Sequence, residues 1–238
     1  GYRVNRQSAT RKLAVWQKTD LLKAVKRIED YFTSNSNRML LINGARQIGK
    51  SYIIRMVGQR MFPNYIEINM EEDKVGERIF AEAKTTKDFY MALSTVAGDK
   101  MQDKASTLVF IDEIQAYDHL LTLVKFLMQE GRFTYIASGS QLGIALKSTS
   151  SIPIGSLTIE QMYPMDFEEF CIANSITTNT LDYLKQCFES TTKVTASIHQ
   201  TMSDLFRYYI VVGGMPEVVK IFVDTHDIGL VIEKQKDI

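Results

Sequence analysis

Eight residues near the start of the chain have the types and spacing of a phosphate-binding loop. Residues 44–51 read Gly-Ala-Arg-Gln-Ile-Gly-Lys-Ser and fit the pattern G-x-x-x-x-G-K-[ST]. Glycines in such a loop let backbone N–H groups approach a phosphate closely, and the N-terminus of a following helix favours an anion. The alternative is a glycine turn before an ordinary amphipathic helix.

The elements around this loop favour the phosphate-binding interpretation. Residues 39–43 are typical of a short buried strand and residues 52–57 of a helix, which is the strand–loop–helix context that the pattern needs. The lysine would reach the β- and γ-phosphates of a nucleotide, and the hydroxyl of the last loop residue would bind Mg²⁺. The residues expected to bind the nucleotide are Gly44, Ala45, Arg46, Gln47, Ile48, Gly49, Lys50, Ser51 and Tyr52.

A second signal is an apolar strand, residues 107–113, that ends in Asp112 and Glu113. A buried parallel strand accommodates acids at its carboxyl end, where α/β sheets bind ligands. We expect Asp112 to hold Mg²⁺ through water, with Ser51 as the other metal ligand. Glu113 would orient and deprotonate the attacking water. The alternative is an acidic loop that caps the next helix, at 118–130.

Two serines follow the next predicted strand, residues 134–137. Ser138 or Ser140 could sense the γ-phosphate or steady the water, and both join Lys50 and Glu113 as candidate catalytic residues. A serine–glycine turn that caps a helix at 141–147 explains these serines equally well.

The remaining periodicity predicts an α/β domain followed by helices. From Pro164 onward the apolar spacing is helical, with a break at Gly213-Gly214. We predict an N-terminal helical lead-in over 1–37, a three-layer P-loop core with a parallel five-stranded sheet over 38–163, and a small helical lid over 164–238. The other expected elements are a helix from Thr19-Asp20 to Phe32, strands at 65–69 and 157–162, helices at 71–84, 86–97, 180–190, 194–212 and 215–223, and a loop at 147–156.

Composition and charge argue against several classes of protein, among them membrane-spanning and zinc-binding proteins. Lys plus Arg and Asp plus Glu each number 28, so overall charge gives no case for nucleic-acid binding. Residues 1–40 are locally basic, and we favour a solvated helix face there over a nucleic-acid patch. The two cysteines lack CxxC spacing, which favours a reducing, cytoplasmic compartment, and we expect neither a membrane span nor a zinc site.

Five short motifs occur in order along the chain. They are the Lys-Ser of the loop, Phe110-Ile111-Asp112-Glu113-Ile114-Gln115, Ala137-Ser138-Gly139-Ser140, residues 163–170 (Tyr-Pro-Met-Asp-Phe-Glu-Glu-Phe) and residues 209–217 (Tyr-Ile-Val-Val-Gly-Gly-Met-Pro-Glu). Together they resemble a known family, the prokaryotic AAA-family ATPases with a C-terminal domain of unknown function. A strand at 65–69 between the loop and the acidic strand is also similar to the additional-strand ATPases, which include the AAA+ group.

This resemblance implies an AAA+-like ATPase core with a helical lid, and ATP and Mg²⁺ as cofactors. It also implies that helical and nuclease-like or winged-helix sequence usually follows. Because the chain ends at Ile238, we expect a fragment that lacks that C-terminal domain.

The chain departs from the family pattern near the fifth strand, where Gly155 is followed by Ser156 instead of arginine. An arginine that neutralises transition-state charge can be worth about a thousandfold in rate, so we predict slow turnover. Arg46, Arg132 and Arg207 are the substitutes in the sequence, and we interpret Arg46 as structural or interfacial.

The leading functional hypothesis is Mg²⁺-dependent ATP binding with slow hydrolysis, which drives an attached or partner domain as a switch or motor. The absence of a guanine-reading NKxD motif favours ATP over GTP. The alternatives are a nucleotide-bound interaction scaffold without turnover, and a DNA-handling ATPase that uses the basic N-terminal segment. Neither the partner nor the oligomeric state follows from the residues.

Overall fold

The computed structural model describes residues 23–34, 36–140 and 154–238. The expected start of the first helix at Thr19-Asp20, most of the basic N-terminal segment and the expected helix at 141–147 lie outside these ranges. Contacts divide the described chain into two units: a core unit, Arg27–Met162, and a helical unit, which consists of residues 23–26 and Tyr163–Ile238.

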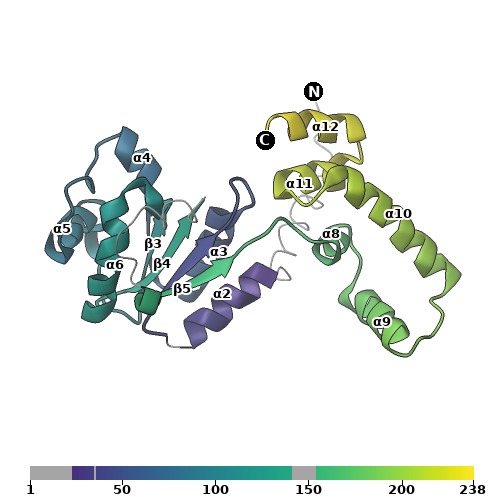
Figure 1. Cartoon of the computed structure of the whole chain (residues 1–238), viewed down its shortest axis with the longest axis horizontal. Helices are drawn as coiled ribbons and strands as arrows, with labels where there is room; N and C mark the ends of the chain where they lie inside the picture. The colour runs from purple at the N-terminus through teal and green to yellow at the C-terminus, as the bar shows by residue number, and fades with distance from the viewer. Residues whose placement is uncertain (1–22, 35, 141–153) are drawn as a thin grey trace, which may run out of the picture. The chain divides into compact units, whose positions relative to one another are not determined.

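The core unit contains a parallel five-stranded sheet with the order β2-β3-β4-β1-β5 (Figure 1). β4 therefore lies between β1, which leads into the phosphate loop, and β3, which ends in the acids. The strand at 65–69, which precedes β3 in the sequence, forms the edge of the sheet instead. The strands are β1 Met39–Asn43, β2 Asn64–Asn69, β3 Thr107–Asp112, β4 Thr134–Gly139 and β5 Leu157–Gln161.

Helices cover both faces of this sheet. Right-handed crossovers place the helix after β1 on one face and those between β2 and β4 on the other, as Figure 1 shows for α3 and for α5 with α6. All six residues of β3 are buried, as expected of a parallel strand covered on both sides. The helices of this region are α2 Lys23–Thr33, α3 Lys50–Met61, α4 Met70–Val75, α5 Thr86–Ala97 and α6 Asp118–Glu130.

The helix expected over 71–84 is wrong in its length. α4 ends at Val75, and Gly76 donates its N–H to the Glu72 carbonyl. The Asp73 carboxylate then accepts the N–H groups of Ile79 and Phe80, at 2.8 and 3.1 Å. A side chain that binds backbone amides in this way competes with helix hydrogen bonds, so the chain turns before α5.

The helical unit has its own core, which confirms the predicted helical region after Pro164. Phe170, Val218, Phe222 and Val231 are fully buried in it. At Gly214 a β-carbon would overlap the Met165 carbonyl, which explains a glycine there. The helices are α8 Phe167–Ala173, α9 Thr178–Glu189, α10 Ala196–Val212, α11 Pro216–Thr225 and α12 Ile228–Lys236.

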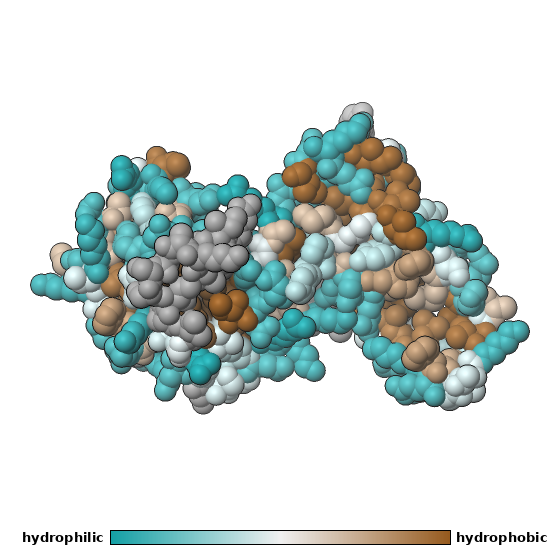
Figure 2. All heavy atoms as spheres, viewed as in Figure 1, coloured by the Kyte–Doolittle hydropathy of each residue, from teal (hydrophilic) through white to brown (hydrophobic). Residues whose placement is uncertain are grey.

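The surface of the helical unit is partly apolar. Figure 2 shows hydrophobic residues exposed on this unit, and the large apolar side chains that are exposed there include Phe188, Phe206 and Ile210. Both cysteines are free and buried. Within the described ranges, no helix has the length and apolar character to span a membrane.

Candidate functional site

The predicted phosphate loop joins the end of β1 to the start of α3. Gly44 donates its N–H to the Gly139 carbonyl at 3.3 Å, so the loop begins beside the end of β4. A β-carbon at Gly44 would lie 2.5 Å from both Ile48 Cδ1 and the Met162 carbonyl oxygen. Gly49 has φ 88°, in the left-handed region that favours glycine. The two glycines of the motif are thus required by close packing and by backbone conformation.

The first turn of α3 adds positive charge where the loop ends. The first N–H groups of a helix have no partner within it, and the helix dipole adds partial positive charge there. Lys50, the first residue of α3, is 4% exposed. Its Nζ donates to the carbonyls of Gly44 and Ala45 at 3.0 and 2.8 Å. Burial lowers the pKa of Lys50, opposed by the charges of Glu113 and Asp112.

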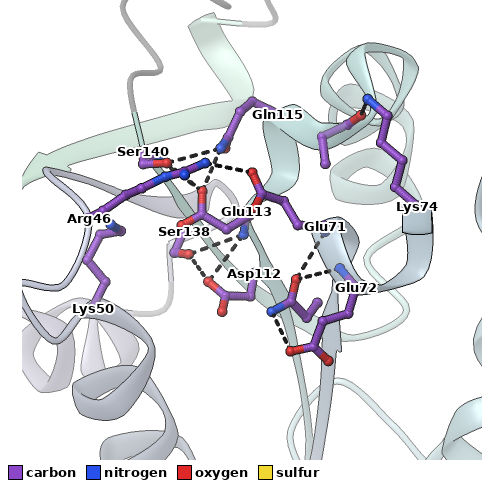
Figure 3. A network of polar contacts seen from close by, with 12 residues as sticks. Arg46, Lys50, Glu71, Glu72, Lys74, Asp112, Glu113, Gln115, Ser138 and Ser140 are labelled. Atoms are coloured by element: carbon purple, nitrogen blue, oxygen red, sulfur yellow. Dashed lines mark hydrogen bonds and ion pairs between the residues drawn. The ribbon is translucent and has the colours of Figure 1, made fainter. Parts of the chain in front are cut away.

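Asp112 connects the acidic strand to the loop. Ser51 Oγ donates to Asp112 Oδ2 at 2.8 Å. Ser138 Oγ donates to Asp112 Oδ1 (Figure 3). Both oxygens of the carboxylate are thus held, one from α3 and one from β4. The hydroxyl and the carboxylate are hard oxygen ligands of the kind that Mg²⁺ prefers.

The residues present fit a Mg²⁺ ion that also binds phosphate. No group of three or more His, Cys, Asp or Glu side chains capable of holding a metal occurs within the part of the chain that the structure describes. Mg²⁺ typically uses one or two protein ligands and completes its shell with water and substrate phosphates. Ser51 and Asp112 would supply those protein ligands.

Glu113 is held in one orientation by three donors. Its Oε2 accepts hydrogen bonds from Ser140 Oγ at 2.8 Å, from the Ser140 N–H at 3.1 Å and from Gln115 Nε2 at 2.5 Å. Burial alone would raise the pKa of Glu113, but the donors and the charge of Lys50 outweigh it and lower the pKa. The backbone of Glu113 has φ 49°, a conformation that is costly for a non-glycine residue and common at functional sites. The side chain is therefore a fixed carboxylate.

The structure brings both candidate serines to the acidic pair. Ser138 is fully buried on β4, and Ser140, which follows this strand, is 4% exposed. Their hydroxyls bind the carboxylates of Asp112 and Glu113 respectively. The helix that they were alternatively expected to cap lies beyond the described residues.

The three arginines named as substitutes each contact a different group. Arg46 extends from the loop and its Nη2 lies 3.0 Å from Glu71 Oε1 (Figure 3). Arg132 lies over the rings of Tyr90 and Phe133, at 4.8 and 5.2 Å. Arg207 belongs to the helical unit, where it pairs with Asp204 at 3.0 Å.

Sequence reasoning did not assign a role to Gln115 or Glu71. Gln115 lies two positions after Glu113. The motif of residues 110–115 includes Gln115, and this was the one signal in the sequence that pointed to it. Glu71 lies near the acidic strand because of β2. The last residue of β2, Asn69, lies opposite Asp112 in the sheet, and the Asn69 side chain caps α4, the helix that carries Glu71. Tyr52, in the first turn of α3, is 38% exposed.

A family model described as an AAA domain matches residues 36–171, more than half of the chain. The chain belongs to this AAA domain family. The match covers the phosphate loop, the acidic strand and the serines of β4. It confirms the predicted AAA-type P-loop ATPase fold, whereas the expected C-terminal domain stays a prediction.

The solved structures that this chain resembles are distant from it in sequence. The Hsp104–ADP complex of S. cerevisiae is 15% identical with a TM-score of 0.50, and the match covers 88% of this chain and 30% of that one. DnaA from Aquifex aeolicus bound to AMPPCP is 9% identical with a TM-score of 0.47, over 90% of this chain and 65% of that one. PCH-2 of C. elegans is 13% identical with a TM-score of 0.45, and the match covers 98% of this chain and 67% of that one. This AAA-family chain thus spans about two thirds or less of these proteins. No curated protein matches its sequence.

Proposed function

We propose that this AAA-family chain binds ATP with Mg²⁺ and hydrolyses the bond to the γ-phosphate. The observation that carries the proposal is the 2.8 Å hydrogen bond from Ser51 to Asp112, which joins the phosphate loop to the acidic strand. It is supported by Lys50, whose buried ammonium group binds loop carbonyls that a phosphate would replace. The ADP in the Hsp104 structure supports a nucleotide as the ligand of this fold.

Each residue has a distinct role in this proposal. The loop amides and Lys50 bind the phosphates, and Ser51 and Asp112 hold Mg²⁺. The ion supplies charge neutralisation for the phosphate oxygens when it is bound. Glu113 accepts a proton from the water whose oxygen attacks the γ-phosphorus, while the bond from that phosphorus to the ADP oxygen breaks. Ser138 and Ser140 hold the two carboxylates in place.

The test compares Glu113→Gln with a matched surface change, Glu82→Gln, at a side chain that is 87% exposed. We expect Mg²⁺-dependent ADP release by the wild type and by the control. Glu113→Gln should lower the single-turnover rate about a hundredfold or more, the usual contribution of a general base, and leave ATP affinity within a few-fold. A wild type that binds ATP without releasing ADP would support the scaffold alternative instead.

We further propose that turnover is slow and serves an attached or partner domain as a switch or motor. The serine after Gly155 supports slow turnover, because the arginine of the family pattern is missing at that position. The exposed Phe188 and Ile210 of the helical unit, 87% and 68% exposed, support a protein partner, since exposed apolar groups commonly mark interaction surfaces.

A further inference from the structure

Arg46 lies inside the phosphate loop and yet is not tied into it. Its side chain is 66% exposed, and the ion pair that the structure gives it is the one with Glu71 on α4, at 3.0 Å. In the view of Figure 3 it extends from the loop toward Glu71, whereas Lys50 turns back onto the loop carbonyls. The loop therefore carries one enclosed cation and one at its open side.

Arg46 is electrostatically close to the expected phosphate site. Arg46 directly follows Gly44 and Ala45, whose carbonyls accept hydrogen bonds from Lys50 Nζ at 3.0 and 2.8 Å. Two cations of one short loop repel each other, and this repulsion would be relieved by an anion between them. A triphosphate bound to the loop would be that anion.

The other arginines have partners of their own. The guanidinium of Arg132 covers two aromatic rings, and that of Arg207 pairs with Asp204 on its own helix. Arg55 on α3 is fixed by both oxygens of Glu67, at 2.8 and 2.5 Å. Arg46 has a single half-exposed partner, and exposed ion pairs of this kind contribute little. Phosphate oxygens can therefore displace Glu71 readily, and they bind guanidinium groups strongly.

We propose that Arg46 is a catalytic residue that leaves Glu71 for the γ-phosphate oxygens of bound ATP and neutralises charge there as the phosphate is transferred to water. The arginine keeps its proton throughout, because the water proton passes to Glu113. It would supply within the chain the cation that Ser156 cannot. This inference rests on the proposed ATPase function and replaces the structural or interfacial interpretation of Arg46.

The first test measures binding of ADP with aluminium fluoride, which mimics the transferred phosphate, against ADP alone. Arg46→Ala should weaken binding of ADP with aluminium fluoride about a hundredfold and change ADP affinity by less than about threefold. Arg46→Lys should restore part of the loss, because it keeps the charge and loses the planar fork. A change that only disturbed the loop would weaken both ligands equally, and that result would overturn the proposal.

The matched control is Arg207→Ala, since Arg207 has an exposed acidic partner at the same 3.0 Å. It should leave both affinities unchanged within about twofold. Glu71→Gln releases Arg46 and should leave the affinity for ADP with aluminium fluoride equal or higher. A loss in Glu71→Gln as large as that in Arg46→Ala would show that the ion pair itself is what matters, and would also overturn the proposal.

Single-turnover hydrolysis separates this inference from the proposed function. The wild-type rate tests the ATPase itself, and the ratio of the Arg46→Ala rate to the wild-type rate tests Arg46. We expect a decrease of about a thousandfold or more, as is known for catalytic arginines. Hydrolysis by Arg46→Ala within about threefold of the wild type would refute the role of Arg46 and leave the ATPase proposal standing. A wild type that does not hydrolyse ATP would refute both.

Discussion

Ser51 Oγ donates a hydrogen bond to Asp112 Oδ2 at 2.8 Å, although 61 positions separate the two residues. Ser51 is in the first turn of α3, and Asp112 is the last residue of β3. Their contact fixes the phosphate loop against the acidic strand before any ligand binds. The proposed Mg²⁺ site would therefore need little rearrangement, because the two oxygens already lie together and the Ser51 hydroxyl would only turn its proton away from Asp112.

Asp112→Asn should weaken the binding of Mg²⁺ and so raise the Mg²⁺ concentration that hydrolysis needs. The amide keeps an oxygen that can accept from Ser51 but loses the charge that attracts the ion. We expect at least a tenfold rise in the Mg²⁺ concentration needed for half-maximal hydrolysis, on the order of the losses seen when a metal site is perturbed. A Mg²⁺ titration measures this, with Asp224→Asn on the exposed side of α11 as the control. An unchanged titration would remove Asp112 from the metal site.

Lys50→Met should change how stability depends on pH in the nucleotide-free protein. Burial lowers the pKa of Lys50 below its ordinary value of 10.5, so between the two values the unfolded state binds more protons than the folded state. The free energy of unfolding of the wild type therefore gains a contribution that rises with pH in this window. Methionine removes that contribution.

Urea denaturation of the wild type and of Lys50→Met, from neutral pH up to the ordinary lysine pKa, gives the free energy of unfolding of each protein as a function of pH. The slopes of the two curves are then compared. We expect the wild type to gain stability relative to Lys50→Met as pH rises. The same variant should lose the stabilisation that ATP confers on the wild type. Parallel pH curves would show that burial does not lower the pKa of Lys50 in the folded protein.

Ser140→Ala should move the acidic limb of the hydrolysis profile to higher pH. Hydrogen bonds from Gln115 and Ser140 outweigh the opposing effect of burial and keep the pKa of Glu113 low. Removing the serine hydroxyl, a donor at 2.8 Å, raises that pKa, so Glu113 becomes protonated and inactive at a higher pH. Single-turnover rates measured over the acidic range test this, and an unmoved limb would mean that Glu113 is not the base.

Gly44→Ala should destabilise the core unit and weaken nucleotide binding together. Its new methyl group would lie 2.5 Å from the Met162 carbonyl oxygen, which is backbone and cannot rotate away. Overpacking of this kind costs about 1–3 kcal/mol. The matched change is Gly155→Ala, because a β-carbon there would meet nothing within 4 Å. Chemical denaturation should show a loss for the first variant and almost none for the second.

The phosphate loop and the acidic strand could be predicted because each is a local pattern. Residues 44–51 combine glycines with Lys-Ser, and residues 107–113 combine an unbroken apolar run with terminal acids. These patterns reflect requirements within one loop or one strand, namely close backbone approach and burial on both faces. The length of α4 could not be predicted in the same way, since the Asp73 carboxylate ends it by binding amides further along the chain.

The sequence by itself thus determined which side chains can bind phosphate and Mg²⁺, and that the chain has an α/β P-loop core followed by helices. Only the tertiary structure decided how those side chains meet. Because β4 enters the sheet between β1 and β3, Ser138 reaches Asp112, Ser140 reaches Glu113, and the edge strand β2 brings Glu71 to Arg46. Strand order is set by packing among distant segments, so no local pattern in the chain records it.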